Sequence, residues 1–302
     1  MLDKQLLPYF FSYLPHVPTQ PILLLHTDYY LPKPIFCFRK PIFLCKYPNL
    51  HPKKLKKTTK NNLKTLALLA ILLVIFIKTN WRAQDRIREI IYDIRNDNHP
   101  LYSKQEITDV LATIATMPYS ELNGEYLEYT KSAHPKYKPL LKDLTYYKVS
   151  RDDMQRRVVG PFRLKQFMCK DEYYIDCALG KEPFVPLPIN PQLFYKTLEL
   201  LDELNRLGYN EDGFVIVNGH RHPAYNEKIG GAKLSRHIKG EAVDISIYDI
   251  NGDGYTDKKD KQIVLDILDK TVIKDKGGIG LYPGTDNVHY DVRGSKARWN
   301  SF

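Results

Sequence analysis

The sequence predicts an α+β fold in which a small antiparallel sheet with flanking helices follows one transmembrane or signal-anchor helix. The first observation is an uninterrupted apolar run from Leu66 to Ile77, with basic residues on both sides. The second is that residues 146–302 mix helical and strand patterns without a regular βαβ alternation. Such mixing is typical of α+β domains, whereas a doubly wound parallel sheet requires the alternation.

The first 62 residues read as an irregular, proline-rich and basic segment. Nine of the 20 prolines lie between Pro8 and Pro52. The formal net charge of +10 also comes from this end. Residues 1–82 hold 13 Lys or Arg and two acidic residues, which leaves 32 of the 45 basic and 33 of the 35 acidic residues for the rest. The remainder is almost neutral, which argues against a nucleic-acid-binding surface.

Residues 63–81 are the predicted membrane anchor. The apolar run is short beside the roughly 20 residues of a full span, but lysines at both ends can reach the interface. The layout also suits a secretory signal, yet Lys78-Thr79-Asn80-Trp81 lacks the small residues of a cleavage site. A buried core helix is a third alternative, which the flanking charges disfavour. More basic residues precede the run than follow it, so we expect a single-pass protein of the cell membrane with an extracytoplasmic C-terminal domain.

The rest of the chain divides into a helical stalk or lead-in, residues 83–145, and a domain of residues 146–302. Ser103 and Glu106 have the spacing of a capping box at a helix start. Helices are expected over residues 191–207 and 263–268, and strands over residues 214–217, 241–247, 278–282 and 288–292. Cys169 and Cys177 are either a small disulfide loop in an oxidising compartment or two buried thiols.

Two histidines and an aspartate in the predicted strand region suggest a metal site. His237 and Asp244 are seven residues apart, and His289 follows on a later strand. Two imidazoles and one carboxylate suit zinc and leave a fourth position for water, as hydrolytic sites require. Zinc in such a site lowers the pKa of its water and polarises a carbonyl group. His289 and Asp291 alternate on their strand and therefore share a face.

The neighbouring residues match a family pattern. The pattern Ser-x-His-x-x-Gly-x-Ala-x-Asp, with a later histidine, is met by Ser235, His237, Gly240, Ala242, Asp244 and His289. Residues 219–226, Gly-His-Arg-His-Pro-Ala-Tyr-Asn, are similar to the family segment Gly-Tyr-Arg-Ser-Pro-x-x-Asn. On these motifs, residues 185–300 resemble the zinc D-alanyl-D-alanine carboxypeptidases and dipeptidases of the lysostaphin/D-Ala-D-Ala/hedgehog metallopeptidase group.

The resemblance implies a role for each matched residue. It makes His237, Asp244 and His289 the zinc ligands. Arg221 would stabilise the oxyanion or hold the substrate carboxylate, and Ser235 would help to bind the substrate terminus. Asp286 takes the place of a glutamate that several members carry three residues before the last histidine, so it is the expected general base. Asp291 competes for that role, but we expect it to orient a ligand histidine.

A second, structural metal ion, Ca²⁺, is expected in residues 249–260. Oxygen ligands fall at positions 1, 3, 5, 9 and 12 of this stretch, position 7 offers a backbone carbonyl, and Gly254 fits the tight turn. The expected ligands are Asp249, Asn251, Asp253, Tyr255, Asp257 and Asp260. The alternative is a polar turn rich in Asp and Gly. The loop follows the strand of Asp244 directly, so calcium would brace the zinc site.

These inferences predict a membrane-anchored zinc peptidase that cleaves peptidoglycan stem peptides at D-amino-acid bonds. The substrate class is implied by the resemblance, which makes peptidoglycan peptides and the membrane the expected partners. One alternative is a non-catalytic, metal-bound module that binds the cell wall. Another is an endopeptidase of the same fold that cuts cross-links. A hydrolase with Asp286 as its base should lose turnover in Asp286→Ala.

Overall fold

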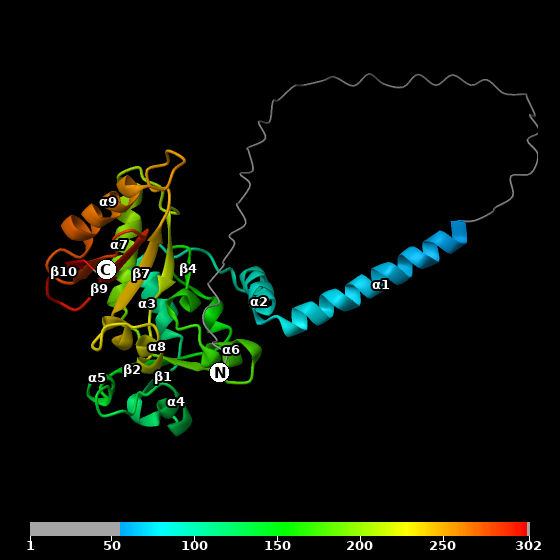
Figure 1. The fold of residues 1–302 in the computed structure, drawn as a ribbon, viewed down its shortest axis with the longest axis horizontal. Helices are drawn as coiled ribbons and strands as arrows, with labels where there is room; N and C mark the ends of the chain where they lie inside the picture. Colours follow the sequence, from blue (N-terminus) through cyan, green and yellow to red (C-terminus); the bar gives the residue numbers. More distant parts are fainter. Residues whose placement is uncertain (1–54, 301–302) are drawn as a thin grey trace, which may run out of the picture. The chain divides into compact units, whose positions relative to one another are not determined.

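The structure is a computed structural model that describes residues 55–300, and these residues form an α+β fold (Figure 1). The first helix, α1 (Leu55–Thr79), includes the stretch Asn62–Thr79, which is long and apolar enough to cross a membrane and has no buried residues. A signal sequence has the same properties. The predicted irregular segment lies mostly outside the described residues, and its last part, residues 55–62, belongs to α1.

A five-stranded sheet forms the centre of the domain. Its strand order is β10-β8-β9-β7-β6, comprising β6 (Phe214–Asn218), β7 (Ala242–Ile247), β8 (Gly278–Leu281), β9 (Asn287–Asp291) and β10 (Ala297–Asn300). Neighbouring strands are antiparallel except β10 and β8, which run parallel. The prediction of a small antiparallel sheet therefore holds for four strands, and a parallel edge strand completes the sheet.

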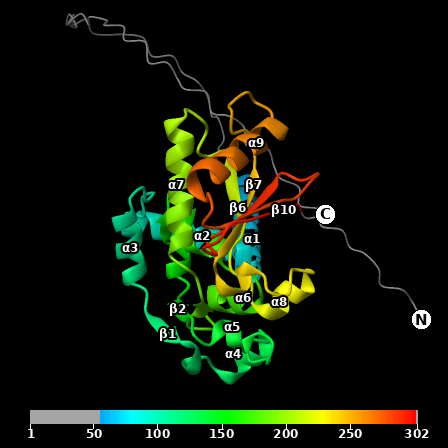
Figure 2. The same ribbon diagram turned by 90° about the vertical axis from the view of Figure 1, so that its left-hand side faces the viewer.

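The two faces of this sheet differ in polarity because side chains alternate along each strand. Val243 and Ile245 of β7 and Tyr290 of β9 are fully buried in the core. Helix α7 (Gln192–Arg206) runs alongside the strands (Figure 2), and the hydroxyl groups of its Thr197 and of Tyr290 are 2.8 Å apart. The alternating positions on β7 and β9, Asp244 and His289, therefore face the other way.

Shorter elements surround the central sheet. The remaining helices are α2 (Trp81–Asn96), α3 (Lys104–Ala112), α4 (Gly124–Tyr129), α5 (Lys138–Leu141), α6 (Glu172–Leu179), α8 (Pro223–Lys228) and α9 (Lys258–Ile267). A three-stranded antiparallel sheet contains β1 (Thr116–Pro118), β2 (Thr145–Val149) and β5 (Val185–Leu187), and β3 (Arg157–Val159) pairs with β4 (Phe162–Arg163). Single turns are η1 (Tyr119–Glu121), η2 (Asp153–Gln155), η3 (Leu164–Phe167), η4 (Arg236–Lys239) and η5 (Leu268–Val272).

The stretch 83–145, expected as a stalk or lead-in, shares the core of the domain. Ser103 and Glu106 form the predicted capping box at the start of α3. Ile107 and Leu111 of this helix belong to the same apolar cluster as the buried residues of α7 and β7. In addition, β1 pairs with β2 across the expected boundary at residue 145. Cys169 and Cys177 are free, buried thiols, which agrees with the second of the two alternatives.

Helix α2 docks on the domain through ion pairs. The Arg163 side chain is 7% exposed, and its guanidinium lies 2.6 Å from Asp93 and 3.2 Å from Glu89 of α2. The Lys165 ammonium lies 3.0 Å from Asp85 and 3.1 Å from Glu89. Hydrogen bonds from Arg163 lower the pKa of Asp93 to about 2. Charged groups of the domain thus replace the water that one face of α2 would otherwise bind.

Replacing Arg163 with Ala should detach α2 from the domain. The change leaves Glu89 half-buried without one of its cations, so we expect the free energy of unfolding to fall by about 3 kcal/mol. Proteolysis near residues 97–100 should also become faster. Because the pKa of Asp93 is lowered by this contact, its contribution is present above about pH 4 and lost as the pH falls toward 2. Lys181→Ala, which breaks an exposed ion pair with Asp176, is the control, and equal effects of the two changes would contradict the prediction.

Candidate metal centre

The three predicted zinc ligands meet on the polar face of the central sheet. Asp244 of β7 and His289 of β9 are direct partners in the antiparallel register, so their side chains leave the sheet side by side. His237 comes from η4, the single turn before β7. All three residues are buried, with relative exposures of 1% for His237, 6% for Asp244 and 4% for His289.

The ligand atoms of this group have the spacing that a tetrahedral metal ion requires. His237 Nε2 lies 3.2 Å from Asp244 Oδ1 and 3.1 Å from His289 Nδ1, and His289 Nδ1 lies 2.9 Å from Asp244 Oδ1. Zinc bonds of 2.0–2.1 Å at tetrahedral angles separate two ligand atoms by about 3.3 Å. The side chains as they stand therefore fit one zinc ion with its fourth position open.

The outer nitrogen of each histidine has its own partner. His237 Nδ1 lies 2.6 Å from the carbonyl oxygen of Gly219, and His289 Nε2 lies 3.2 Å from Asp291 Oδ2. Each contact places a proton on the outer nitrogen and a lone pair on the inner one. With both rings neutral, two nitrogen lone pairs and a carboxylate oxygen converge on one point. A metal ion, or a proton on His289, satisfies such a set of acceptors.

The protonation states also favour metal binding. Burial lowers the pKa of His237, so its ring is neutral at pH 7. Burial alone would raise the pKa of Asp244, but the neighbouring His237, His289 and Arg221 hold it well below the usual range. His289 has a raised pKa, against the effect of burial, because Asp244 and Asp291 attract positive charge to this point. A bound metal ion would meet that demand in place of a proton.

Gly240 explains the spacing between the two ligands of the motif. It ends η4 with a φ of +67°, a conformation that favours glycine. A Cβ atom here would overlap the carbonyl oxygen of Pro188. The glycine therefore lets the chain turn sharply from His237 into β7 while the backbone of residue 188 packs against it.

The metal group opens into a cleft of about 730 Å³. Arg221 and Ser235 line this cleft, as their predicted roles require. The Arg221 side chain is 10% exposed and donates a short hydrogen bond to Asp244 Oδ2. Its buried Nε has no hydrogen-bond partner among the described residues. An unpaired guanidinium N–H beside a metal group is suited to an anionic oxygen of a ligand.

The structure does not bring Asp286 into the metal group. It lies in the exposed turn before β9 and is not part of the cleft lining, although its neighbours Thr285 and Asn287 are. Asn287 and His289 share one strand face, and a residue three positions before His289 falls on the other. The catalytic role of Asp286 stays a prediction that its position does not support. Asp291, by contrast, is fully buried and contacts His289, as expected of an orienting residue.

Three further residues of the cleft were given no role from the sequence. Tyr282 lies with its hydroxyl 3.5 Å from Asp244 Oδ1, and burial with the nearby Asp244 raises its pKa to about 12. The centre of the Trp299 ring lies 5.0 Å from that of His289, with the two rings tilted by 58°. The Arg293 guanidinium lies 5.0 Å from the Trp299 ring and binds Asp291. The sequence did carry a signal for Tyr282, because it is the last residue of the predicted strand 278–282, which precedes the predicted strand of His289.

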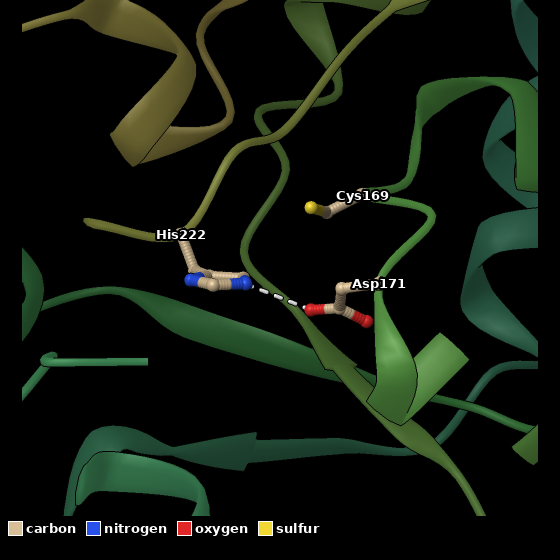
Figure 3. A group of neighbouring side chains, drawn as sticks. All are labelled: Cys169, Asp171 and His222. Atoms are coloured by element: carbon tan, nitrogen blue, oxygen red, sulfur yellow. Dashed lines mark ion pairs between the residues drawn. The ribbon is translucent and has the colours of Figure 1, made fainter. Parts of the chain in front are cut away.

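A second cluster, Cys169, Asp171 and His222, also brings possible metal ligands within 4.8 Å (Figure 3). His222 Nδ1 accepts a hydrogen bond from the Tyr225 backbone as the N-cap of α8, so the proton of a neutral ring is on Nε2. Nε2 lies 2.8 Å from Asp171 Oδ2, and Asp171 itself caps α6. Burial raises the pKa of the Cys169 thiol. These contacts describe two linked helix caps, and a protonated Nε2 is not a metal ligand.

In the predicted calcium loop, residues 249–260, several of the expected ligands accept hydrogen bonds from backbone N–H groups. Asp249 accepts hydrogen bonds from the backbone of residues 253 and 254, and buried Asp260 accepts them from residues 250, 251 and 257. The Tyr255 side chain is exposed, Asn251 donates to Asp253, and Asp257 caps α9. Within residues 55–300, the groups of three His, Cys, Asp or Glu ligands do not include this loop. Calcium binding stays a prediction.

Comparison with known proteins gives one match. Residues 169–291, less than half of the chain, match the sequence model of the family Peptidase M15. The matched segment includes His237, Asp244, His289 and Arg221, and the match supports a metallopeptidase domain of the M15 zinc peptidase family. No curated protein gives a significant match. No solved structure does either.

Proposed function

We propose that this protein is a membrane-anchored zinc metallopeptidase that hydrolyses peptidoglycan stem peptides at D-amino-acid bonds, as D-Ala-D-Ala carboxypeptidases do. The observation that carries the proposal is the convergence of three acceptor atoms, 2.9–3.2 Å apart, at the wall of an open cleft. The match to Peptidase M15 supports the metallopeptidase class. The substrate and the bond cleaved rest on the motif resemblance.

The residues of the cleft have separate roles in the proposed peptide hydrolysis. Zinc held by His237, Asp244 and His289 would polarise the scissile carbonyl and lower the pKa of its water. Arg221 lines the same cleft, has one N–H without a partner, and is suited to the oxyanion or a substrate carboxylate. Ser235, half-buried at the start of η4, offers a hydroxyl to the peptide terminus.

The charge of the cleft favours an acidic peptide. Three arginines line it, Arg221, Arg236 and Arg293, whereas the carboxylate among its lining residues is the ligand Asp244. Arg236 and Arg293 pair with Glu241 and Asp291, so they are not free anchors, and the excess positive charge would come from a bound zinc ion with Arg221. Such a surface attracts peptides with several carboxylates, which is the character of peptidoglycan stems.

Tyr282 is the proposed hydrogen-bond donor to the developing charge. Because its pKa is raised to about 12, the hydroxyl keeps its proton and donates rather than acting as a base. We expect Tyr282→Phe to lower kcat about 100-fold with zinc content unchanged, since one donor to the oxyanion is lost. Steady-state kinetics with metal analysis would check this. Tyr209→Phe, which changes a tyrosine outside the cleft, is the control. Equal kcat for Tyr282→Phe and the parent would remove Tyr282 from the mechanism.

The general base is tested by Asp286→Ala. Turnover should disappear with zinc retained if the exposed turn 283–286 carries this carboxylate into the cleft when substrate binds. Unchanged turnover would exclude Asp286, and another group would then have to accept the proton of the bound water. Asp275→Ala, another exposed aspartate, is the matched control.

Two other functions would use the same site. A cell-wall binding module would hold zinc and stem peptides without cleavage, and an endopeptidase would cut cross-linked rather than terminal bonds. Incubating the full chain in membranes with purified muropeptides, followed by mass analysis of the products, distinguishes all three. Loss of one terminal residue supports the proposal, release of cross-linked partners supports the endopeptidase, and binding without products supports the module.

We also propose that α1 anchors the domain outside the cytoplasm. The apolar stretch Asn62–Thr79 and the excess of basic residues before it support this topology. Protease added to intact spheroplasts should degrade the domain of the anchored chain. Protection of the domain until the membrane is opened would contradict the orientation.

A further inference from the structure

Helix α2 has its apolar side turned away from the domain. The residues that contact the domain, Asp85, Glu89 and Asp93, follow one another at four-residue intervals and carry negative charge. On the opposite side stand Ile87, Ile90, Ile91 and Ile94. A helix on the surface of a soluble domain normally buries its apolar side and exposes its charges. Here the arrangement is reversed.

The four isoleucines form one continuous stripe. Their positions have the spacing i, i+3, i+4, i+7, which places them on one side of a helix. Their relative exposures are 37% for Ile87, 51% for Ile90, 41% for Ile91 and 79% for Ile94. Contiguous apolar surface of this kind marks an interaction site, whereas single exposed apolar residues are ordinary.

The occupant of this stripe follows from what precedes it in the chain. Helix α1 ends at Thr79 and α2 begins at Trp81, with Asn80 between them as the N-cap of α2. If α1 spans the membrane, the chain leaves the bilayer within about one residue of the start of α2. We propose that α2 lies on the outer surface of that membrane, with the four isoleucines in the boundary between headgroups and acyl chains. This inference rests on the membrane anchor of the proposed function, but not on its peptidase activity.

The charges beside the stripe fit a lipid surface. Arg86 and Arg95 are exposed, and at 100° per residue they fall between the isoleucines and the docked side of the helix. Basic residues at the margin of an apolar stripe pair with phosphate headgroups, as in other interfacial helices. A second copy of the chain would need roughly 800 Å² from each partner for a stable contact, which four partly exposed isoleucines do not provide.

Docking of α2 at the membrane would hold the whole domain there. The ion pairs of Arg163 and Lys165 join α2 to the domain, so the domain is not free to swing on a tether. Its cleft would then act on substrate close to the membrane surface, at a distance limited by the size of the domain.

The test uses the full chain reconstituted in vesicles of phosphatidylcholine and phosphatidylglycerol, with and without brominated acyl chains. Bromine quenches tryptophan only on contact, so Ile94→Trp reports whether α2 meets lipid, after the signal of the parent with Trp81 and Trp299 is subtracted. Ile94 is the most exposed of the four, so the larger side chain does not disturb the core. Val74→Trp in α1 is the positive control, and Leu207→Trp, 44% exposed after α7, is the matched exposed control.

We expect bromine to reduce the added fluorescence of Ile94→Trp and Val74→Trp at least twofold and to leave that of Leu207→Trp unchanged. Quenching at Val74 alone would overturn the proposal while leaving the anchor in place. Quenching at neither position would remove the anchor and the proposal together. An Ile94→Trp signal that responds to protein density in the vesicle, and not to bromine, would assign the stripe to a second copy and overturn it as well. None of these readouts depends on peptidase activity.

Discussion

Replacing His237 with Ala should remove zinc from the domain and lower peptide hydrolysis at least about 1,000-fold. Two ligands remain after the change, and zinc sites of hydrolases need three protein ligands to leave one position for water. His237 also connects the metal to Gly219 through its outer nitrogen, so the loop before α8 loses a contact as well. Metal analysis of the purified full chain and turnover of muropeptides measure the two effects separately.

The control for this prediction is His134→Ala, which removes an exposed histidine outside the cleft. It should keep both stoichiometric zinc and activity. Asp244→Ala is expected to behave as His237→Ala does, since both supply an atom of the same triangle. Full zinc occupancy in His237→Ala would show that the metal, if present, is held elsewhere, and the assignment of the centre would fail.

The metal ligands were predictable because each depends on local geometry. His237 and Asp244 are joined by one turn, whose sharpness is set by Gly240, and a strand places Asp244 on a fixed face. His289 joins them through the antiparallel register of β7 and β9, which a sequence pattern of two adjacent strands already suggests. The role of Asp286 was implied by the resemblance and not by such geometry, and it stays a prediction, because Asp286 lies in the exposed turn before β9.

Long-range packing was not predictable from the same patterns. The parallel edge strand β10 returns beside β8 from the end of the chain, and its four residues carry no period that distinguishes the two directions. Helix α2 lies mostly in the stretch 83–145, which was predicted as a helical stalk or lead-in. The partners of its acidic residues, Arg163 and Lys165, lie 70 to 80 residues later in the sequence. Ion pairs between such distant segments leave no trace in the spacing of either one.

Arg221→Ala should separate catalysis from metal binding. The guanidinium contacts Asp244, and Arg221 also lines the cleft, so its loss is expected to affect both the ligand and the substrate. We expect kcat to fall about 100- to 1,000-fold, because a donor to the developing oxyanion is worth roughly 3–4 kcal/mol in such sites. Zinc should remain bound, since the metal itself then balances the charge of Asp244.

Arg221→Lys refines this experiment. Lysine keeps the charge but cannot contact Asp244 and substrate at the same time, so it should recover less than a tenth of the lost kcat. Arg206→Ala, which removes an exposed arginine of α7, is the matched control and should leave kinetics unchanged. A rise in KM with normal kcat in Arg221→Ala would move this residue from the transition state to ground-state binding of the substrate carboxylate, which is the other role that its position allows.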